Sequence, residues 1–288
     1  MNMPDTNHSG ISNSEMTRRT ELVEPRSRAT RLAIADLVLG LLSYRIWTML
    51  AWQEIRQRYR RSVLGPLWLT LSTGIMVTAM GPLYTRLFGQ TLNSYFSYLA
   101  TSIVVWQLIS TMIQDSCQAF IGSEGFIKQL KLPLSLYVLR IVWKNLIIFA
   151  HNIIVVLIVF LFFPPPFGLK TLMFPVGLAL VAANGVWLGI VIGLLCARFR
   201  DVSNIVNSVV GVLFFMTPIM WSSKMLGENE RMVDFNPFYH LIEVVRGPLL
   251  SDELRAISWI SVLAITFLGF GFMLFMFSRY RARIAYWI

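Results

Sequence analysis

Long apolar runs dominate this 288-residue chain and restrict it to folds that a lipid bilayer can hold. A helix needs roughly 20 apolar residues to cross the hydrocarbon core, and six segments approach or exceed that length. They are residues 64–88, 95–113, 141–163, 172–197, 205–221 and 257–277. Hydrophobic residues make up 56% of the chain and charged residues 14%, which is not typical of a soluble domain. We therefore predict an all-α, polytopic membrane protein with six transmembrane helices.

A seventh apolar segment, residues 32–52, contains charged residues that are costly inside a membrane. Asp36 and Arg45 interrupt it, and its uninterrupted apolar stretches are too short to cross a bilayer. No small-residue cleavage site follows the segment, which argues against a signal peptide. We favour an amphipathic helix lying in the cytoplasmic interface of the membrane, with a further span as the alternative.

The second half of this segment has the periodicity of a helix with one apolar face. The apolar residues at helical spacing are Trp47, Ala51, Ile55 and Tyr59. Glu54 and Arg58 stand four residues apart, and we expect them to form an ion pair. The residues assigned to this interfacial helix are Trp47, Glu54, Arg56, Arg58, Tyr59, Arg60 and Arg61.

The basic residues are distributed unevenly about the predicted spans. Most of the 25 Lys and Arg residues lie in the N-terminal region, after the second span, after the fourth span and in the C-terminal segment. The positive-inside rule places these segments, and both termini, in the cytoplasm. The net charge of +10 is then mainly a topology signal, with some attraction to anionic membrane lipids. Because the arginines flank spans and form no basic domain, we expect no nucleic-acid partner.

Three parts follow from this pattern: a polar N-terminal tail at residues 1–30, the interfacial helix region at 31–63, and a six-span transmembrane domain at 64–288. The sequence has no phosphate-binding loop, hydrolase motif or metal-ligand spacing. We therefore predict no catalytic residue, no cofactor and no metal on this chain. Cys117 and Cys196 indicate no disulfide framework, and we expect both to be packing residues.

Two polar residues, His151 and Asn152, lie inside the third predicted span. An ionisable group within a membrane is a candidate functional residue. The alternative is hydrogen bonding between helices, which we favour.

A short helix is predicted between the fifth and sixth spans, at residues 235–250. Asn236 is suited to cap it, Pro237 suits its first position, and Gly247-Pro248 is expected to end it. The residues expected to share its apolar face are Phe238, Leu241, Ile242 and Val245. The helix is too short to cross a bilayer, so it lies either on the outer surface or within the protein.

Four sequence motifs, in this order, resemble a known family. RYRRSVLGPLW follows the interfacial helix, ARFRD follows the fourth span, TPIMW closes the fifth, and NPFYHLIEVVRGPLL precedes the sixth. Together they resemble the membrane subunit of ABC exporters that transport O-antigen, capsule, teichoic acid and related polysaccharides. The likeness extends over residues 44–288, and its specificity rests on the order and spacing of the motifs.

The resemblance implies a transport subunit rather than an enzyme. In that family two permease chains form a homodimer around a channel, and two nucleotide-binding ABC ATPase subunits dock below it. ATP and Mg²⁺ would bind to those partner subunits. The cargo would be a lipid-linked polysaccharide of O-antigen or capsule type, moved from the cytoplasmic to the outer side of the bacterial inner membrane.

The resemblance also implies roles for particular segments. The interfacial helix and the loop at 124–133 would contact the ATPase, with a coupling element formed by Glu124, Phe126, Ile127, Lys128, Leu130 and Lys131. Re-entrant helices between spans five and six would gate the channel exit, through Asn236, Pro237, His240, Glu243 and Arg246. Sugar rings stack on aromatic faces, and the candidate channel aromatics are Trp68, Tyr84, Phe214, Phe215 and Trp221. An interfacial aromatic belt is the alternative for these five.

Two other functions are weighed against this one. An ion-coupled secondary transporter needs titratable residues within its spans, and the span interiors offer His151 and little else. A membrane-embedded glycolipid-modifying transferase needs clustered acids or histidines at one membrane face. The carboxylates available on the outer side are scattered, and they are Glu228, Glu230, Asp234, Glu243, Asp252 and Glu253.

Overall fold

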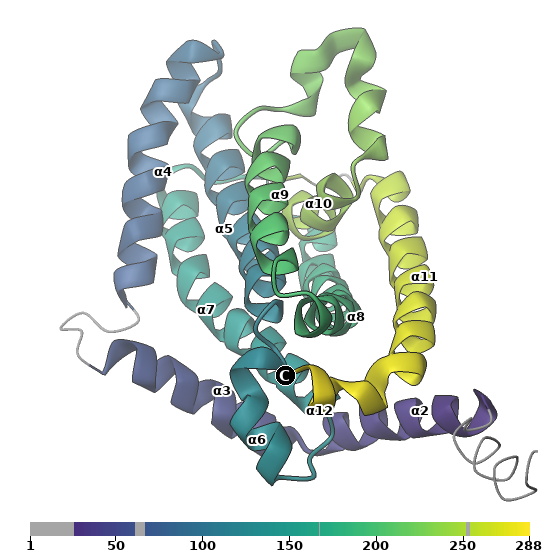
Figure 1. The fold of residues 1–288 in the computed structure, drawn as a ribbon. Helices are drawn as coiled ribbons and strands as arrows, with labels where there is room; N and C mark the ends of the chain where they lie inside the picture. Colours follow the sequence, from purple (N-terminus) through teal and green to yellow (C-terminus); the bar gives the residue numbers. More distant parts are fainter. Residues whose placement is uncertain (1–25, 61–66, 167, 252–253) are drawn as a thin grey trace, which may run out of the picture.

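In a computed structural model, the chain is a helical bundle without strands over the residues that the structure describes, 26–60, 67–166, 168–251 and 254–288 (Figure 1). Six helices run alongside one another. They are α4 (Leu67–Leu87), α5 (Leu92–Ser116), α7 (Ser135–Phe162), α8 (Phe174–Arg198), α9 (Val202–Met216) and α11 (Ala256–Tyr280). Each corresponds to one predicted span, and the all-α prediction is confirmed for the described residues.

Length and composition qualify four helices among the described residues as candidate spans. They are Tyr95–Ser116, Ser135–Phe162, Leu169–Arg198 and Ala256–Trp287. The apolar run of α4 is broken by hydroxyl-bearing residues and by Pro82, although the helix itself continues. The helix α9, with 15 residues, is shorter than a bilayer core requires. For these two helices, spanning stays a prediction.

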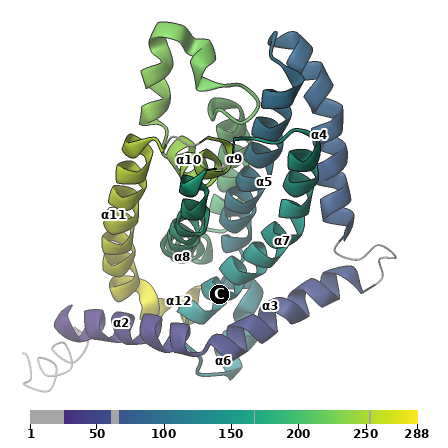
Figure 2. The same cartoon turned by 180° about the vertical axis from the view of Figure 1, so that it is seen from behind.

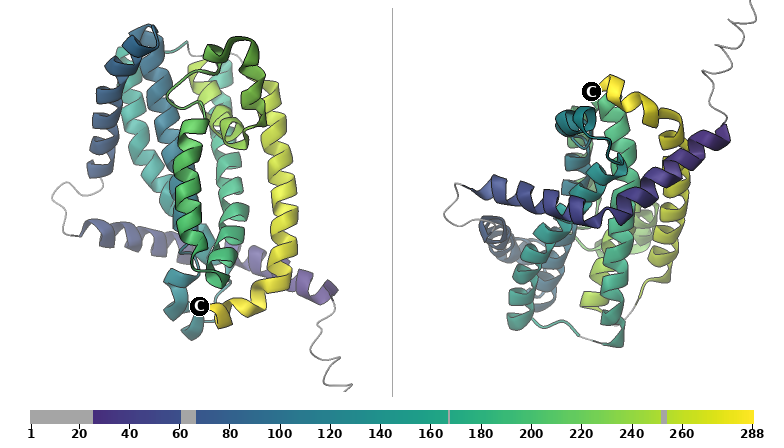
Figure 3. Two further views of the ribbon diagram at one scale, coloured as in Figure 1. Left: turned by 45° about the horizontal axis from the view of Figure 1, so that its top comes forward. Right: turned by 90° about the horizontal axis from the view of Figure 1, so that it is seen from below.

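Two helices, α2 (Arg26–Leu42) and α3 (Tyr44–Tyr59), cross one end of the bundle (Figures 1 and 2). The two helices meet at an angle of 65°, and only together are they long and apolar enough to cross a bilayer. The view from below shows them running across the ends of the bundle helices (Figure 3). The interfacial location stays a prediction, with one bent span as its alternative. α2 begins inside the segment 1–30, which the sequence analysis assigned to a polar tail.

The predicted apolar face of α3 packs on α7. Ala51 and Ile55 are buried, and the Trp47 ring meets Trp143 edge-on with centroids 5.7 Å apart. The side chain of Tyr59, the residue Arg61 and the predicted turn at Gly65-Pro66 lie outside the described residues.

α5 occupies the centre of the bundle, where a small polar cluster joins three helices. Gln107 Oε1 accepts hydrogen bonds from Thr73 Oγ1 on α4 at 3.1 Å and from Asn152 Nδ2 on α7 at 3.0 Å. His151 Nδ1 lies 2.8 Å from Ile147 O of its own helix. Asn152 thus links helices, as the packing interpretation expected, and His151 bonds to its own backbone.

Candidate functional site

The helix α10 (Pro237–Leu250) lies inside the bundle, at the end opposite α2 and α3 (Figure 1). The predicted cap is confirmed: Asn236 Oδ1 accepts from the backbone N–H of Phe238 at 3.0 Å and of Tyr239 at 3.4 Å. Asn236 Nδ2 also donates to Thr217 Oγ1 at 3.0 Å, which ties the start of α10 to the end of α9. The cap therefore orients α10 relative to a neighbouring helix.

The predicted end of this helix at Gly247-Pro248 is wrong, because α10 continues through Pro248 to Leu250. Proline has no N–H to donate, so it leaves the carbonyl of Val244, four residues earlier, without its helical partner. That carbonyl lies against the Cα of Gly177 on α8, where any side chain would collide with backbone atoms. The proline thus frees a carbonyl at a point where α8 and α10 are in backbone contact.

α10 is buried on all faces. Residues 239–248 are buried except Glu243, which is half-buried, and the helix packs against α5, α8 and α11. The residues expected on the apolar face lie in or against the core, and the polar side chains His240 and Arg246 also face protein. A helix lying on the outer surface would leave one face exposed, so the surface alternative does not fit this packing.

Arg246 is the most enclosed charge on α10, with 4% of its side chain exposed. Its Nη2 lies 2.6 Å from Glu243 Oε2, and its Nη1 donates to Ser102 Oγ at 2.9 Å and to Pro218 O at 2.8 Å. The guanidinium also lies over the Tyr98 ring, 4.3 Å from its centroid. One arginine thus joins α10 to α5 and to the segment that follows α9.

His240 anchors the other side of α10 to the outer segment η3 (Ser223–Phe235) and to α11. Its Nε2 lies 2.9 Å from Asp234 O, and its Nδ1 lies 3.0 Å from Ser258 Oγ. A carbonyl only accepts, so Nε2 donates the hydrogen bond to Asp234 O. Both ring nitrogens are engaged, which gives His240 a structural role.

Three of the carboxylates weighed above, Glu230, Asp234 and Glu243, pair with arginine, and Asp252 and Glu253 lie outside the described residues. Arg255 contacts Asp234 Oδ1 at 2.8 Å and Glu230 Oε1 at 3.8 Å. Among the described residues, no group of three or more His, Cys, Asp or Glu side chains is arranged to hold a metal. A cavity of about 770 Å³ borders this network and is lined by charged and aromatic groups, including Tyr98, Glu243 and Arg246.

The opposite end of the bundle carries the short helix α6 (Glu124–Gln129), which projects below the other helices (Figure 1). The apolar side chains of Phe126 and Leu130 are exposed by 47% and 48%. Ile127 is half-buried and points back to the core. Lys131, just beyond the helix, is exposed. Two apolar groups on a projecting helix are therefore free of contacts that would bury them within this chain.

Lys128 fixes the orientation of α6. Its Nζ lies 2.7 Å from Glu124 Oε1 and 2.9 Å from Ile288 O in the C-terminal segment. The hydrogen bond from Lys128 and its positive charge hold the pKa of the Glu124 carboxyl below its usual range. The short helix is thereby tied to α12 (Ile284–Trp287), far away in the sequence.

A buried charge network that was not predicted from the sequence joins α3 to the bundle. Lys144 on α7, 4% exposed, lies 2.5 Å from Glu54 Oε1 and 2.9 Å from Asp115 Oδ2. Arg140 lies 3.6 Å from Glu54 and donates to Ser123 Oγ, next to α6, at 3.3 Å. The predicted Glu54–Arg58 pair is wrong, because Glu54 faces α7.

Asp36 forms a second unpredicted junction. Its charge was a reason to expect that this segment does not cross the membrane. In the structure the Asp36 side chain is buried within the protein, with 2% of it exposed. Its carboxylate accepts from the backbone N–H groups of Leu134 and Ser135, at 3.1 and 2.9 Å, at the start of α7. Arg281 donates to the same carboxylate at 2.8 Å. Unpaired N–H groups at a helix start favour an anion, so Asp36 docks α2 there.

The candidate channel aromatics do not form one wall within the chain. Phe214 and Phe215 meet edge-on at 5.2 Å, and Trp221 donates from Nε1 to Phe215 O at 3.3 Å. Trp68 and Tyr84 lie on α4, which is separated from α9 by α5 (Figure 1). The structure therefore brings together three of the five residues at the end of α9.

These features define a multi-pass helical membrane protein, with several apolar helices, a buried helix at one end and a projecting helix at the other. Residues 45–250 match the family described as ABC-2 type transporter, and the chain belongs to this family. It is accordingly a transport subunit of an ABC exporter and not an enzyme. Membership implies pairing with ATPase subunits.

The curated relatives are O-antigen export proteins. The chain is 24% identical over 243 residues, covering 81% of this chain and 91% of the relative, to an "O-antigen export system permease protein RfbA" of Klebsiella pneumoniae. A second Klebsiella pneumoniae protein of that name is 26% identical over 220 residues, covering 74% and 83%. A Myxococcus xanthus protein of that name is 23% identical over 210 residues, covering 72% and 81%.

Proposed function

We propose that this chain is the membrane-spanning half of an exporter that moves a lipid-linked polysaccharide, of O-antigen or capsule type, to the outer side of the bacterial inner membrane. The observation that carries the proposal is the match to O-antigen export permeases over 72–81% of the chain. Two copies form the channel, and ATP and Mg²⁺ bind to separate ATPase subunits. Six spans cross the membrane, with α2 and α3 in the cytoplasmic interface.

The arrangement of the termini supports this topology. The first described residue, Arg26, and the C-terminal Ile288 lie at the same end of the bundle (Figure 1). An even number of membrane crossings places both ends of a chain on the same side of the membrane. The same end carries α6 and most of the basic residues, which favours a cytoplasmic location.

The buried helix α10 is the proposed outer gate. Backbone that does not cross the membrane is tolerated at membrane depth where protein or a water-filled cavity surrounds it, and α10 is enclosed by protein with a polar cavity beside it. Arg246 holds it to α5 and to the segment that follows α9 through two hydrogen bonds, to Ser102 Oγ and to Pro218 O. A movement of α9 would therefore be transmitted to α10.

The projecting helix α6 is the proposed coupling element. Its exposed Phe126 and Leu130 suit an apolar groove on an ATPase subunit, in the way that short amphipathic helices bind partner grooves. Arg140 connects the start of α6 with Glu54 on α3. ATP-driven movement of α6 would thus reach both the interfacial helix and the spans.

The coupling role is tested with the double variant Phe126→Asp/Leu130→Asp. We expect the ATPase subunit to be lost from pull-downs in mild detergent, and glycan export to fall by at least about tenfold, because two apolar anchors are replaced by charges. The control, Met232→Asp, changes an exposed apolar residue at the opposite end of the bundle and should leave both readouts unchanged. Normal export by the double variant would refute the assignment.

A further inference from the structure

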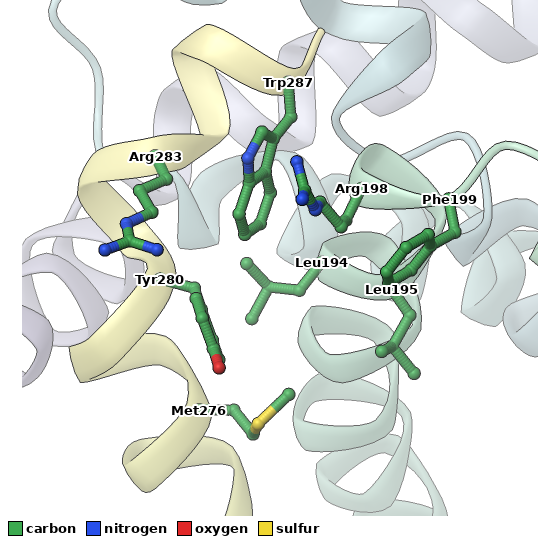
Figure 4. Close-up of a pocket in the computed structure, with 8 residues that line it drawn as sticks. All are labelled: Leu194, Leu195, Arg198, Phe199, Met276, Tyr280, Arg283 and Trp287. Carbon is green, nitrogen blue, oxygen red and sulfur yellow. The ribbon is translucent and has the colours of Figure 1, made fainter.

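A second cavity, of about 360 Å³, lies between the ends of α8 and α11 on the side of the bundle that carries α2 and α3 (Figure 4). Its floor is apolar and is formed by Leu194, Leu195 and Met276. The size is within the range of small-molecule sites, which are mostly apolar with a few placed polar groups. No role proposed above uses this cavity.

Two arginines stand at the cavity, on either side of the Trp287 ring (Figure 4). Arg198 ends α8, and its guanidinium lies 5.4 Å from the Trp287 centroid and 5.6 Å from the Phe199 centroid. Arg283 comes from the segment η4 (Arg281–Arg283) that follows α11. Stacking on aromatic faces positions a guanidinium while leaving its N–H groups, which point outward in the plane, free to bond.

Neither arginine has a carboxylate partner in the described part of the chain. Other arginines near these helix ends do: Arg281 pairs with Asp36 at 2.8 Å, and Arg140 lies 3.6 Å from Glu54. Arg198 and Arg283 are also exposed, so their donors are available to a ligand. The cavity therefore combines an apolar floor, aromatic walls and two free cationic groups.

We propose that this cavity binds the phosphate headgroup of an anionic amphiphile. The two guanidiniums would take the phosphate oxygens, since arginine pairs with phosphate through parallel charge-assisted hydrogen bonds. Leu194, Leu195 and Met276 would contact the first methylenes of the chain. Basic pockets between transmembrane helices on the cytoplasmic side have this preference. A membrane phospholipid and a polyprenyl diphosphate share the required chemistry.

Native mass spectrometry of the purified, lipid-depleted full chain tests the site, with phosphatidylglycerol titrated in a neutral detergent. We expect one tightly retained phosphatidylglycerol on the wild type and at least about a tenfold rise in its Kd for Arg198→Ala/Arg283→Ala, since each lost charge-assisted bond costs roughly that factor. Arg279→Ala is the matched control, because Arg279 is exposed on the last turn of α11 but does not line the cavity. Arg198→Lys keeps the charge without the planar fork and should bind with intermediate affinity.

Each outcome decides the proposal. Equal loss of binding in the Arg279 control, or equal retention of diacylglycerol, which lacks phosphate, would overturn it. Displacement of the retained phosphatidylglycerol by an equimolar polyprenyl diphosphate supports the site and assigns it to a carrier lipid, whereas failure of displacement supports it as a phospholipid site. The assay requires neither an ATPase partner nor export, so its result is independent of the proposed function.

Discussion

At the scale of single residues, Arg246 is the group whose removal has the clearest consequence. It is nearly fully enclosed and has four kinds of partner: a carboxylate, a hydroxyl, a backbone carbonyl and an aromatic ring. Arg246→Ala leaves Glu243 without its cation, and breaking a buried ion pair costs about 3–5 kcal/mol. We therefore expect a lower Tm in detergent and altered export or leak, with ATPase binding retained because α6 is at the other end.

A double substitution that removes both charges separates the effect of an unpaired buried charge from the effect of lost side-chain packing. In Glu243→Gln/Arg246→Gln both charges are absent, so part of the lost Tm should return relative to Arg246→Ala. A Tm for Arg246→Ala equal to that of the wild type would show that the ion pair does not hold α10 in place.

At the scale of elements, the contact of α10 with α8 depends on one glycine. The freed carbonyl of Val244 fills the space that a Cβ at Gly177 would occupy, and the colliding atoms belong to the backbone. Gly177→Ala should therefore displace α10 and destabilise the bundle by about 1–3 kcal/mol, the usual range for overpacking. Faster amide hydrogen exchange in residues 237–250 is the expected measurement.

Gly211→Ala is the control for this prediction. Gly211 is also within a bundle helix, but a Cβ there would meet no atom within 4 Å. Exchange in α10 should be unchanged, and an equal effect of the two substitutions would mean that general helix rigidity, and not the α8–α10 contact, is being measured.

Some features of these elements could be predicted from the local sequence, and others could not. The positions of the long helices, the apolar face of α3 and the Asn236 cap follow from local patterns of apolar spacing and helix-start chemistry, and the structure reproduces them. The end of α10 was missed because Pro248 is tolerated where its freed carbonyl has a neighbour. The positions of Lys144 and Asp36 depend on partners about 90 to 245 residues away, which no local pattern reveals.

At the scale of the whole molecule, three distant segments converge beneath the bundle. Asp36 of α2 joins the start of α7 to Arg281, and Lys128 of α6 reaches Ile288. The helices α2 and α6 and the C-terminal segment therefore form one connected layer (Figure 3). If the positive-inside rule is obeyed, this whole layer faces the cytoplasm, and η3 faces outward.

That orientation is testable with single introduced cysteines, because the native Cys117 and Cys196 are buried and give little background labelling. Lys131→Cys and Met232→Cys each place a thiol at an exposed position, at opposite ends of the bundle. In cells whose outer membrane has been made permeable, a maleimide that does not cross the inner membrane should label position 232 and not position 131. Lysis should then make position 131 reactive. Labelling of position 131 alone in intact inner membranes would invert the topology, and with it the assignment of α6 to the ATPase and of α10 to the outer gate.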